Sequence, residues 1–166
     1  MSTIKLGGNN IETNGALPKV GDSAPDFNLT AQDLSSKKLS DYNGSRVVMN
    51  IFPSIDTGVC ATSARKFNEE ASKLKNTKIL CISKDLPFAQ KRFCAAEGIN
   101  NLEMLSDFRD GNFGKNYGVE MTSGALSGLH SRAVVVLDEN GKVIYNELVP
   151  EIGEEPDYIS ALKPLL

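Results

Sequence analysis

The chain has 166 residues, of which 40% are hydrophobic, and this is enough to build one domain around its own hydrophobic core. Its formal net charge of −3 argues against a surface for nucleic acid or for an anionic membrane. No stretch reaches the apolar length of a membrane span, and the N-terminus lacks the apolar core and cleavage site of a secretory signal. We therefore expect a single cytoplasmic domain over residues 1–166, with no membrane contact.

The first twenty residues predict a hairpin extension. Residues 4–6 and 11–13 are short strand-like runs, and the sequence between them contains Gly-Gly-Asn-Asn at residues 7–10. These residue types supply the positive φ angles that a hairpin turn requires. A mobile tail is the alternative at this end of the chain.

The middle of the chain predicts a buried strand, a tight loop and a helix. The run VVMNIF at residues 47–52 has the length and β-branched composition of a strand that is buried on both faces. Pro53 ends this run because proline has no N–H to donate to a sheet ladder. Residues 54–57 contain three helix-starting residue types, and apolar residues at helical spacing follow to about residue 75. Cys60 therefore falls in the first turn of a helix.

Further strands and helices alternate along the rest of the chain. Strand-like segments lie at residues 27–30, within 32–41, and at 78–83, 102–106, 133–137 and 143–148. Helical segments lie at residues 88–97, 113–117 and 156–165. Asn140 and Gly141, between two apolar runs, are a strong hairpin signal. This order is typical of an α/β sheet with helices on both faces.

The predicted position of Cys60 indicates a reactive thiol. Unpaired N–H groups and the positive end of the helix dipole favour a thiolate, which is the nucleophilic form of cysteine. Thr57 can place a hydroxyl beside the sulfur, and Pro53 can shield it from water. The alternative is a structural cysteine at the start of a helix, since free cysteines are among the most buried residues. Position alone leaves both interpretations open.

The residues around Cys60 also match a known motif. Pro53, Thr57 and Cys60 spell P-x-x-x-T-x-x-C, the active-site motif of peroxiredoxins. The longer string SIDTGVCATSARKFN, at residues 54–68, resembles the bacterial thiol peroxidase branch, whose members are atypical two-cysteine peroxiredoxins. This resemblance implies a thioredoxin-like fold, with a central mixed β-sheet flanked by helices and the N-terminal hairpin over residues 1–20 as an addition.

The resemblance implies a role for each site residue. Cys60 would be the peroxidatic nucleophile, which attacks hydrogen peroxide or an organic hydroperoxide and becomes a sulfenic acid. Cys94, in the string DLPFAQKRFC, resembles the resolving cysteine that closes an intrachain disulfide. Arg132 resembles the arginine that completes the site beside Thr57 and Pro53. Without the resemblance, Cys94 is interpreted as a packed helix residue and Arg132 as a solvated charge.

Two cysteines on separate helices seldom meet the Cα separation of about 7 Å that a disulfide needs. We therefore expect the Cys60 turn and the Cys94 helix to unwind partly during turnover. Cys81 lies inside a predicted strand and is interpreted as a core residue. His130 is the only histidine, and thiolate chemistry does not require it.

The resemblance implies thioredoxin as the external electron donor, a homodimer as the assembly, and no resident cofactor. No clustered Cys/His set for zinc and no haem or flavin motif is present. The alternative function is a thiol-based peroxide sensor that passes oxidation to a partner protein. Phe88 and Phe93 can form apolar walls with Pro53, which predicts a preference for organic hydroperoxides over hydrogen peroxide.

Overall fold

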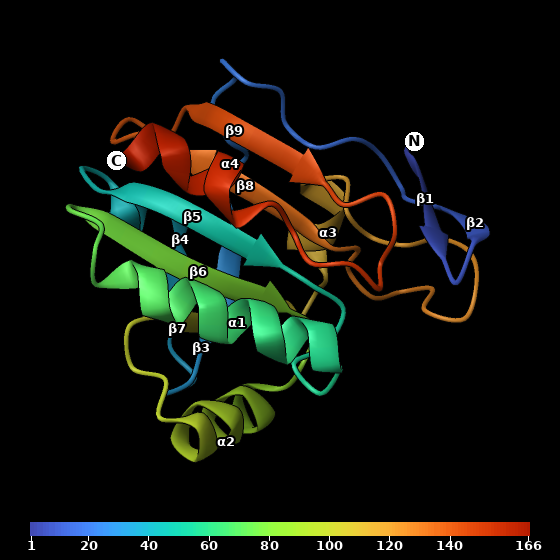
Figure 1. Ribbon diagram of the computed structural model, residues 1–166, viewed down its shortest axis with the longest axis horizontal. Helices are drawn as coiled ribbons and strands as arrows, with labels where there is room; N and C mark the ends of the chain where they lie inside the picture. Colours follow the sequence, from blue (N-terminus) through green and yellow to red (C-terminus); the bar gives the residue numbers. More distant parts are fainter.

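The computed structural model describes residues 1–166 and contains nine strands. Their bounds are β1 Thr3–Leu6, β2 Asn9–Glu12, β3 Asn28–Ala31, β4 Ser36–Lys38, β5 Arg46–Ile51, β6 Thr77–Ser83, β7 Glu103–Ser106, β8 Ala133–Leu137 and β9 Val143–Leu148. Seven of them form a central sheet in the order β4-β3-β7-β6-β5-β8-β9 (Figure 1). β5, β6 and β7 are parallel, and the remaining pairs are antiparallel, so the sheet is mixed as predicted.

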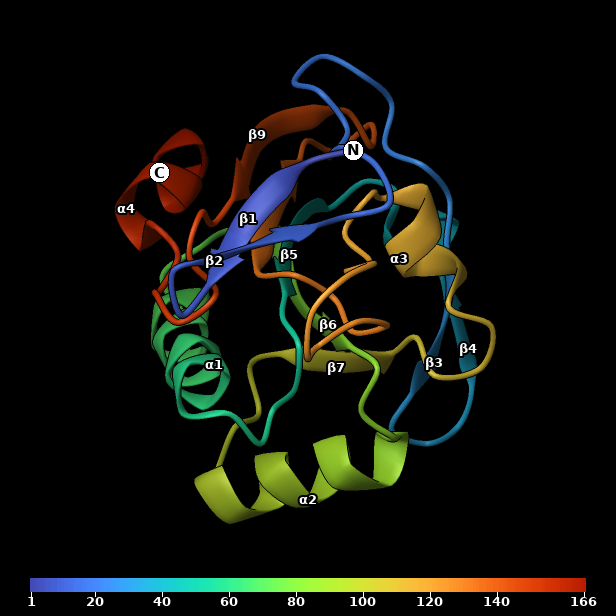
Figure 2. The same cartoon turned by 90° about the vertical axis from the view of Figure 1, so that its right-hand side faces the viewer.

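Helices cover both faces of this sheet. Their bounds are α1 Gly58–Ala71, α2 Pro87–Glu97, α3 Asn112–Asn116 and α4 Tyr158–Leu162, with short 3-10 turns at Leu39–Tyr42 and Lys163–Leu165. Figure 2 shows α1 and α4 on one side of the central strands and α3 on the other. Successive side chains of β5 point to opposite faces of the sheet, which gives each face an apolar surface for helices to cover. Met49 packs on the α3 side, whereas Val48 packs with α1 and α4. None of the helices is both long and apolar enough to cross a bilayer.

The N-terminal hairpin is present and is held against the domain. β1 and β2 pair in the antiparallel sense, with Ile4 opposite Ile11. Both side chains are buried in a small apolar cluster with Met121 and Ile152. This cluster gives the hairpin a buried face, so the alternative of a mobile tail is wrong.

Two helix boundaries differ from the predictions. α1 ends at Ala71 because the chain then turns tightly and reverses at Asn76, which has a φ of 48°. The helix predicted over residues 156–165 is split into α4 and a 3-10 turn. Asp157 caps α4, so the helix begins at the next residue, and Pro164 has no N–H to continue the α-helical ladder.

Three segments that carry candidate site residues meet at one edge of the sheet. β5 and β6 are parallel, so the loops that follow them leave the sheet at the same edge. β8 is antiparallel to β5 and pairs Ala133 with Ile51. Arg132 therefore enters the sheet beside the end of β5, next to the loop that leads to Cys60.

Candidate functional site

Cys60 lies in the first turn of α1, as predicted. Thr57 is the N-cap of the helix, and Cys60 is fully buried. Its neighbours in the apolar cluster include Phe52 and Ile55, which come from the end of β5 and the following loop. The positive end of the α1 dipole lies at this turn and favours negative charge on the sulfur.

Arg132 supplies a cation beside Cys60. Its Nη2 atom donates a hydrogen bond to Cys60 Sγ at 3.3 Å, and its Nε atom donates to the Ile152 carbonyl at 2.9 Å. The side chain is only 2% exposed, so the interpretation of Arg132 as a solvated charge is wrong. Its Nη1 atom is buried and has no partner within the protein. A guanidinium keeps its donors in a fixed plane, so Arg132 can bond the sulfur and the Ile152 carbonyl and still keep Nη1 as an unused donor.

Thr57 and Pro53 frame the loop between β5 and α1. Thr57 is exposed, and its Oγ1 atom donates a hydrogen bond to the Ser54 carbonyl at 3.1 Å. The hydroxyl therefore supports the loop, and no hydrogen bond joins it to Cys60. Pro53 is buried directly after β5. Of the predicted apolar walls, Phe93 packs against the Cys60 cluster, whereas Phe88 is 66% exposed and is not part of it.

The three cysteines are free thiols in one apolar cluster. Cys94, in α2, is 8% exposed, and its Sγ atom accepts a hydrogen bond from Gln32 Nε2 at 3.4 Å. Burial raises the pKa of the Cys94 thiol, and the Gln32 hydrogen bond opposes this rise. Cys60 and Cys94 thus have different partners and lie on two intact helices, so a disulfide between them is not formed in this structure.

Cys81 is buried in β6, as its sequence context predicts. Burial raises the pKa of the Cys81 thiol to about 12, and a hydrogen bond from Asn50 opposes the rise. This thiol is protonated at neutral pH and packs as a core side chain.

The pKa of Cys81 predicts a loss of stability at alkaline pH. Above the ordinary value of 9.0, the unfolded chain releases the Cys81 proton while the folded chain keeps it, which favours unfolding as the pH rises toward about 12. We expect the free energy of unfolding to fall by about 2 kcal/mol more in wild type than in Cys81→Ala between pH values of about 8.5 and 10.5. Urea denaturation at both pH values measures the difference, and equal losses in the two proteins would contradict the prediction.

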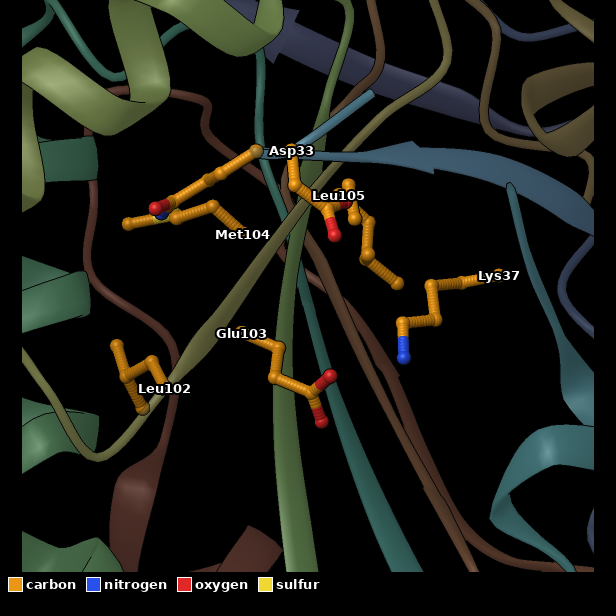
Figure 3. Close-up of a pocket in the computed structure, with 8 residues that line it drawn as sticks. Asp33, Lys37, Leu102, Glu103, Met104 and Leu105 are labelled. Carbon is orange, nitrogen blue, oxygen red and sulfur yellow. The ribbon is translucent and has the colours of Figure 1, made fainter. Parts of the chain in front are cut away.

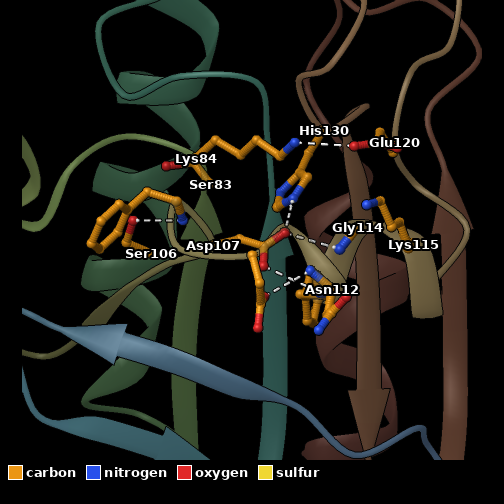
Figure 4. A network of polar contacts seen from close by, with 12 residues as sticks. Ser83, Lys84, Ser106, Asp107, Asn112, Gly114, Lys115, Glu120 and His130 are labelled. Atoms are coloured by element: carbon orange, nitrogen blue, oxygen red, sulfur yellow. Dashed lines mark hydrogen bonds and ion pairs between the residues drawn. The ribbon is translucent and has the colours of Figure 1, made fainter.

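His130 is buried, which sequence reasoning did not foresee. Its Nε2 atom lies 2.9 Å from Asp107 Oδ2, and the same carboxylate accepts hydrogen bonds from the backbone N–H groups of Phe113 and Gly114 (Figure 4). The network joins the end of β7 to the start of α3 and to the segment that enters β8. His130 lies two residues before Arg132, so the network supports the segment that carries this arginine. The sequence showed only that His130 is the single histidine of the chain, which does not predict its burial.

A pocket of about 250 Å³ lies between β3 and β7 (Figure 3). It is lined by Ala31, Gln32, Asp33, Lys37, Leu102, Glu103, Met104 and Leu105. The two strands pair over only two residues and then separate, which leaves this space. Gln32 lines the pocket and also bonds Cys94, whereas Cys60 and Arg132 are not part of it.

The sequence and the structure both resemble known thiol peroxidases. The redoxin family model matches residues 19–162. The chain is 53% identical over 165 residues to a thiol peroxidase of Corynebacterium glutamicum, with 99% of each chain covered. A peroxiredoxin-like protein from Aquifex aeolicus is 41% identical, with a TM-score of 0.93 over 99% of this chain and 96% of that one. A thiol peroxidase from Chromobacterium violaceum, at 24% identity, shares the fold with a TM-score of 0.91 over 98% and 94% of the two chains. The chain therefore belongs to the redoxin family and, within it, to the thiol peroxidases.

Proposed function

We propose that this chain is a thiol-dependent peroxidase that reduces hydrogen peroxide and organic hydroperoxides, with Cys60 as the nucleophile. The observation that carries the proposal is the buried guanidinium of Arg132 beside the Cys60 sulfur at the start of α1. Both the helix dipole and the guanidinium favour a thiolate there. The identity to a named thiol peroxidase supports the same reaction.

In the first step, the Cys60 thiolate attacks one peroxide oxygen and the O–O bond breaks. The sulfur becomes a sulfenic acid, and the other oxygen leaves as hydroxide or alkoxide and takes up a proton to become water or an alcohol. Arg132 Nη1, which has no protein partner, is a donor for the charge that develops on the oxygens. Thr57 completes the site by holding the loop through the Ser54 carbonyl, the N–H groups of the first turn of α1 add further donors, and Pro53 keeps water from one side.

In the second step, the Cys94 thiol condenses with the sulfenic acid to form an intrachain disulfide and release water. The two thiols lie on separate intact helices, each with its own partner. The turn at Cys60 and the α2 helix therefore unwind partly for this step. A dithiol donor of the thioredoxin type then reduces the disulfide and is itself oxidised, so the cycle needs no resident cofactor. A cytoplasmic homodimer is the assembly expected for such a protein.

The test uses the reduced wild-type protein. One equivalent of peroxide per chain should link residues 60 and 94, detected as a disulfide-joined peptide pair by mass spectrometry. Thioredoxin, thioredoxin reductase and NADPH should then support continuous peroxide consumption. Unlinked cysteines after stoichiometric oxidation would refute the proposal. A disulfide that thioredoxin leaves intact, but that transfers to one partner protein, would favour the peroxide relay instead.

A further inference from the structure

Asp85 connects the two segments that carry the reactive cysteines. It lies in the turn between β6 and α2, the helix of Cys94. Its Oδ1 atom accepts a hydrogen bond from Ser54 Oγ at 2.7 Å, and its Oδ2 atom accepts one from the backbone N–H of Ile55, also at 2.7 Å. Both donors belong to the loop that leads from Pro53 to the start of α1. One carboxylate thus holds the Cys60 loop to the start of the Cys94 helix.

The same carboxylate reaches into α2 through Ser83. Ser83 Oγ donates to Asp85 Oδ2 at 2.6 Å and accepts from the Gln90 side-chain amide at 3.3 Å. Gln90 is fully buried, and its amide also donates to the Leu105 carbonyl at 3.0 Å. Because Gln90 lies one helical turn before Cys94, the network extends from the Cys60 loop to the turn that precedes the second cysteine.

The two ion pairs that join α1 or its preceding loop to α2 are more exposed. Arg92 and Asp56 approach to 3.5 Å, but about two-thirds of each side chain is exposed, so solvent screens the pair. The pair of Arg65 and Glu97 joins α1 to the far end of α2, away from the loop. Asp85 is half-buried and accepts three hydrogen bonds as an ion, and such charge-assisted bonds are the stronger kind.

We propose that Asp85 is a positioning residue that clamps the Cys60 loop to the start of α2. The clamp keeps the two segments closed for peroxide attack and makes them open as one unit for disulfide formation. The contacts of the clamp do not depend on the reaction, whereas its kinetic consequence rests on the proposed peroxidase function. A carboxylate suits this position because its two oxygens accept at once from the Ile55 N–H, which can only donate, and from two serine hydroxyls. Asparagine has the same shape but is neutral and keeps one acceptor oxygen, so it replaces these charge-assisted bonds with weaker neutral ones and turns a serine hydroxyl from donor to acceptor.

The first arm of the test needs no peroxide. Amide hydrogen exchange of the reduced protein is compared in wild type, Asp85→Asn and Glu97→Gln, which removes an equal charge from α2 without touching the loop. We expect Asp85→Asn to speed exchange about tenfold at the hydrogen-bonded amides of Thr57 and Ala61 and at residues 90–94 together, leaving out Ile55, whose N–H bonds the carboxylate directly. Glu97→Gln should leave the loop amides within about twofold of wild type. Acceleration in only one segment, or in neither, would overturn the clamp.

The second arm measures the two chemical steps separately, by rapid quench and mass spectrometry. Asp85→Asn should slow the oxidation of Cys60 about tenfold, because the loop is displaced, and should speed the closure of the disulfide several-fold, because opening is easier. Glu97→Gln should leave both rates within about twofold of wild type. A loss of general stability would not change the two rates in opposite directions, so rates that both fall or both stay constant would overturn the clamp. If wild type forms no sulfenic acid at Cys60, the proposed peroxidase function fails. The hydrogen-exchange measurement still shows whether Asp85 clamps the two segments, because it uses no peroxide.

Discussion

Cys60→Ser is expected to abolish peroxide turnover, whereas Cys94→Ser is expected to permit one turnover per chain and then stop. A serine hydroxyl at residue 60 stays protonated beside Arg132 and is a far weaker nucleophile than a thiolate. A serine at residue 94 cannot condense with the sulfenic acid, so Cys60 remains oxidised and exposed to further oxidation. The measurement is NADPH consumption in the thioredoxin-coupled assay, together with the mass of the protein after one equivalent of peroxide.

The third cysteine provides a matched control for this pair. Cys81→Ala removes a thiol from the same apolar cluster, but one that is protonated and packed inside β6. We expect this variant to form the disulfide between residues 60 and 94 and to turn over within about threefold of wild type. Sustained turnover in Cys94→Ser would show that another thiol resolves Cys60, and loss of the disulfide in Cys81→Ala would identify that thiol.

The sequence predicts the unit of β5, loop and α1 because each of its signals is local. Five apolar residues in a run of six, one proline and a cluster of helix-starting residues determine the strand, its end and the first turn of the helix. The hairpin of β8 and β9 is similarly local, since Asn140 and Gly141 lie between two apolar runs, and the structure has it at the predicted bounds. The position of Cys60 in its helix follows directly from these local patterns.

The partners of Cys60 could not be predicted in this way, because they depend on strand register. Arg132 contacts a residue that is 72 positions away, and only the antiparallel pairing of Ala133 with Ile51 brings it there. Without that register, an arginine before a strand is indistinguishable from an exposed charge. The family resemblance implied the role of Arg132, and the structure adds the hydrogen bond from its Nη2 atom to Cys60 Sγ.

Buried polar networks are the second kind of feature that sequence patterns miss. Asp85 resembles an ordinary residue of a turn before a helix, and His130 resembles an ordinary residue of a glycine-rich loop. Their burial and their partners come from segments that meet only in the folded chain, such as Ser54 for Asp85 and Asp107 for His130. Hydrogen bonding of buried charge is a property of the tertiary structure, so periodicity carries no signal for it.

Arg132→Met is expected to lower kcat/KM for peroxide about 1,000-fold, and Arg132→Lys about 100-fold. Methionine fills a similar volume but removes every donor, so the thiolate loses its cation and the peroxide oxygens lose Nη1. Lysine keeps a positive charge, but a single ammonium cannot bond the Ile152 carbonyl and also reach the sulfur with the planar geometry of a guanidinium. Lysine therefore recovers part of the loss.

Rapid-quench measurement of Cys60 oxidation separates this effect from the later steps. The disulfide should still form in both variants once the sulfenic acid is present, because the Cys94 contacts do not include Arg132. Arg65→Met, at an exposed arginine of the same helix as Cys60, is the matched control and should oxidise within about twofold of wild type. Circular dichroism checks that the Arg132 variants fold. A folded Arg132→Met variant that oxidises Cys60 as fast as wild type would show that the helix N-terminus alone activates the thiol, and the electrostatic role assigned to Arg132 would be wrong.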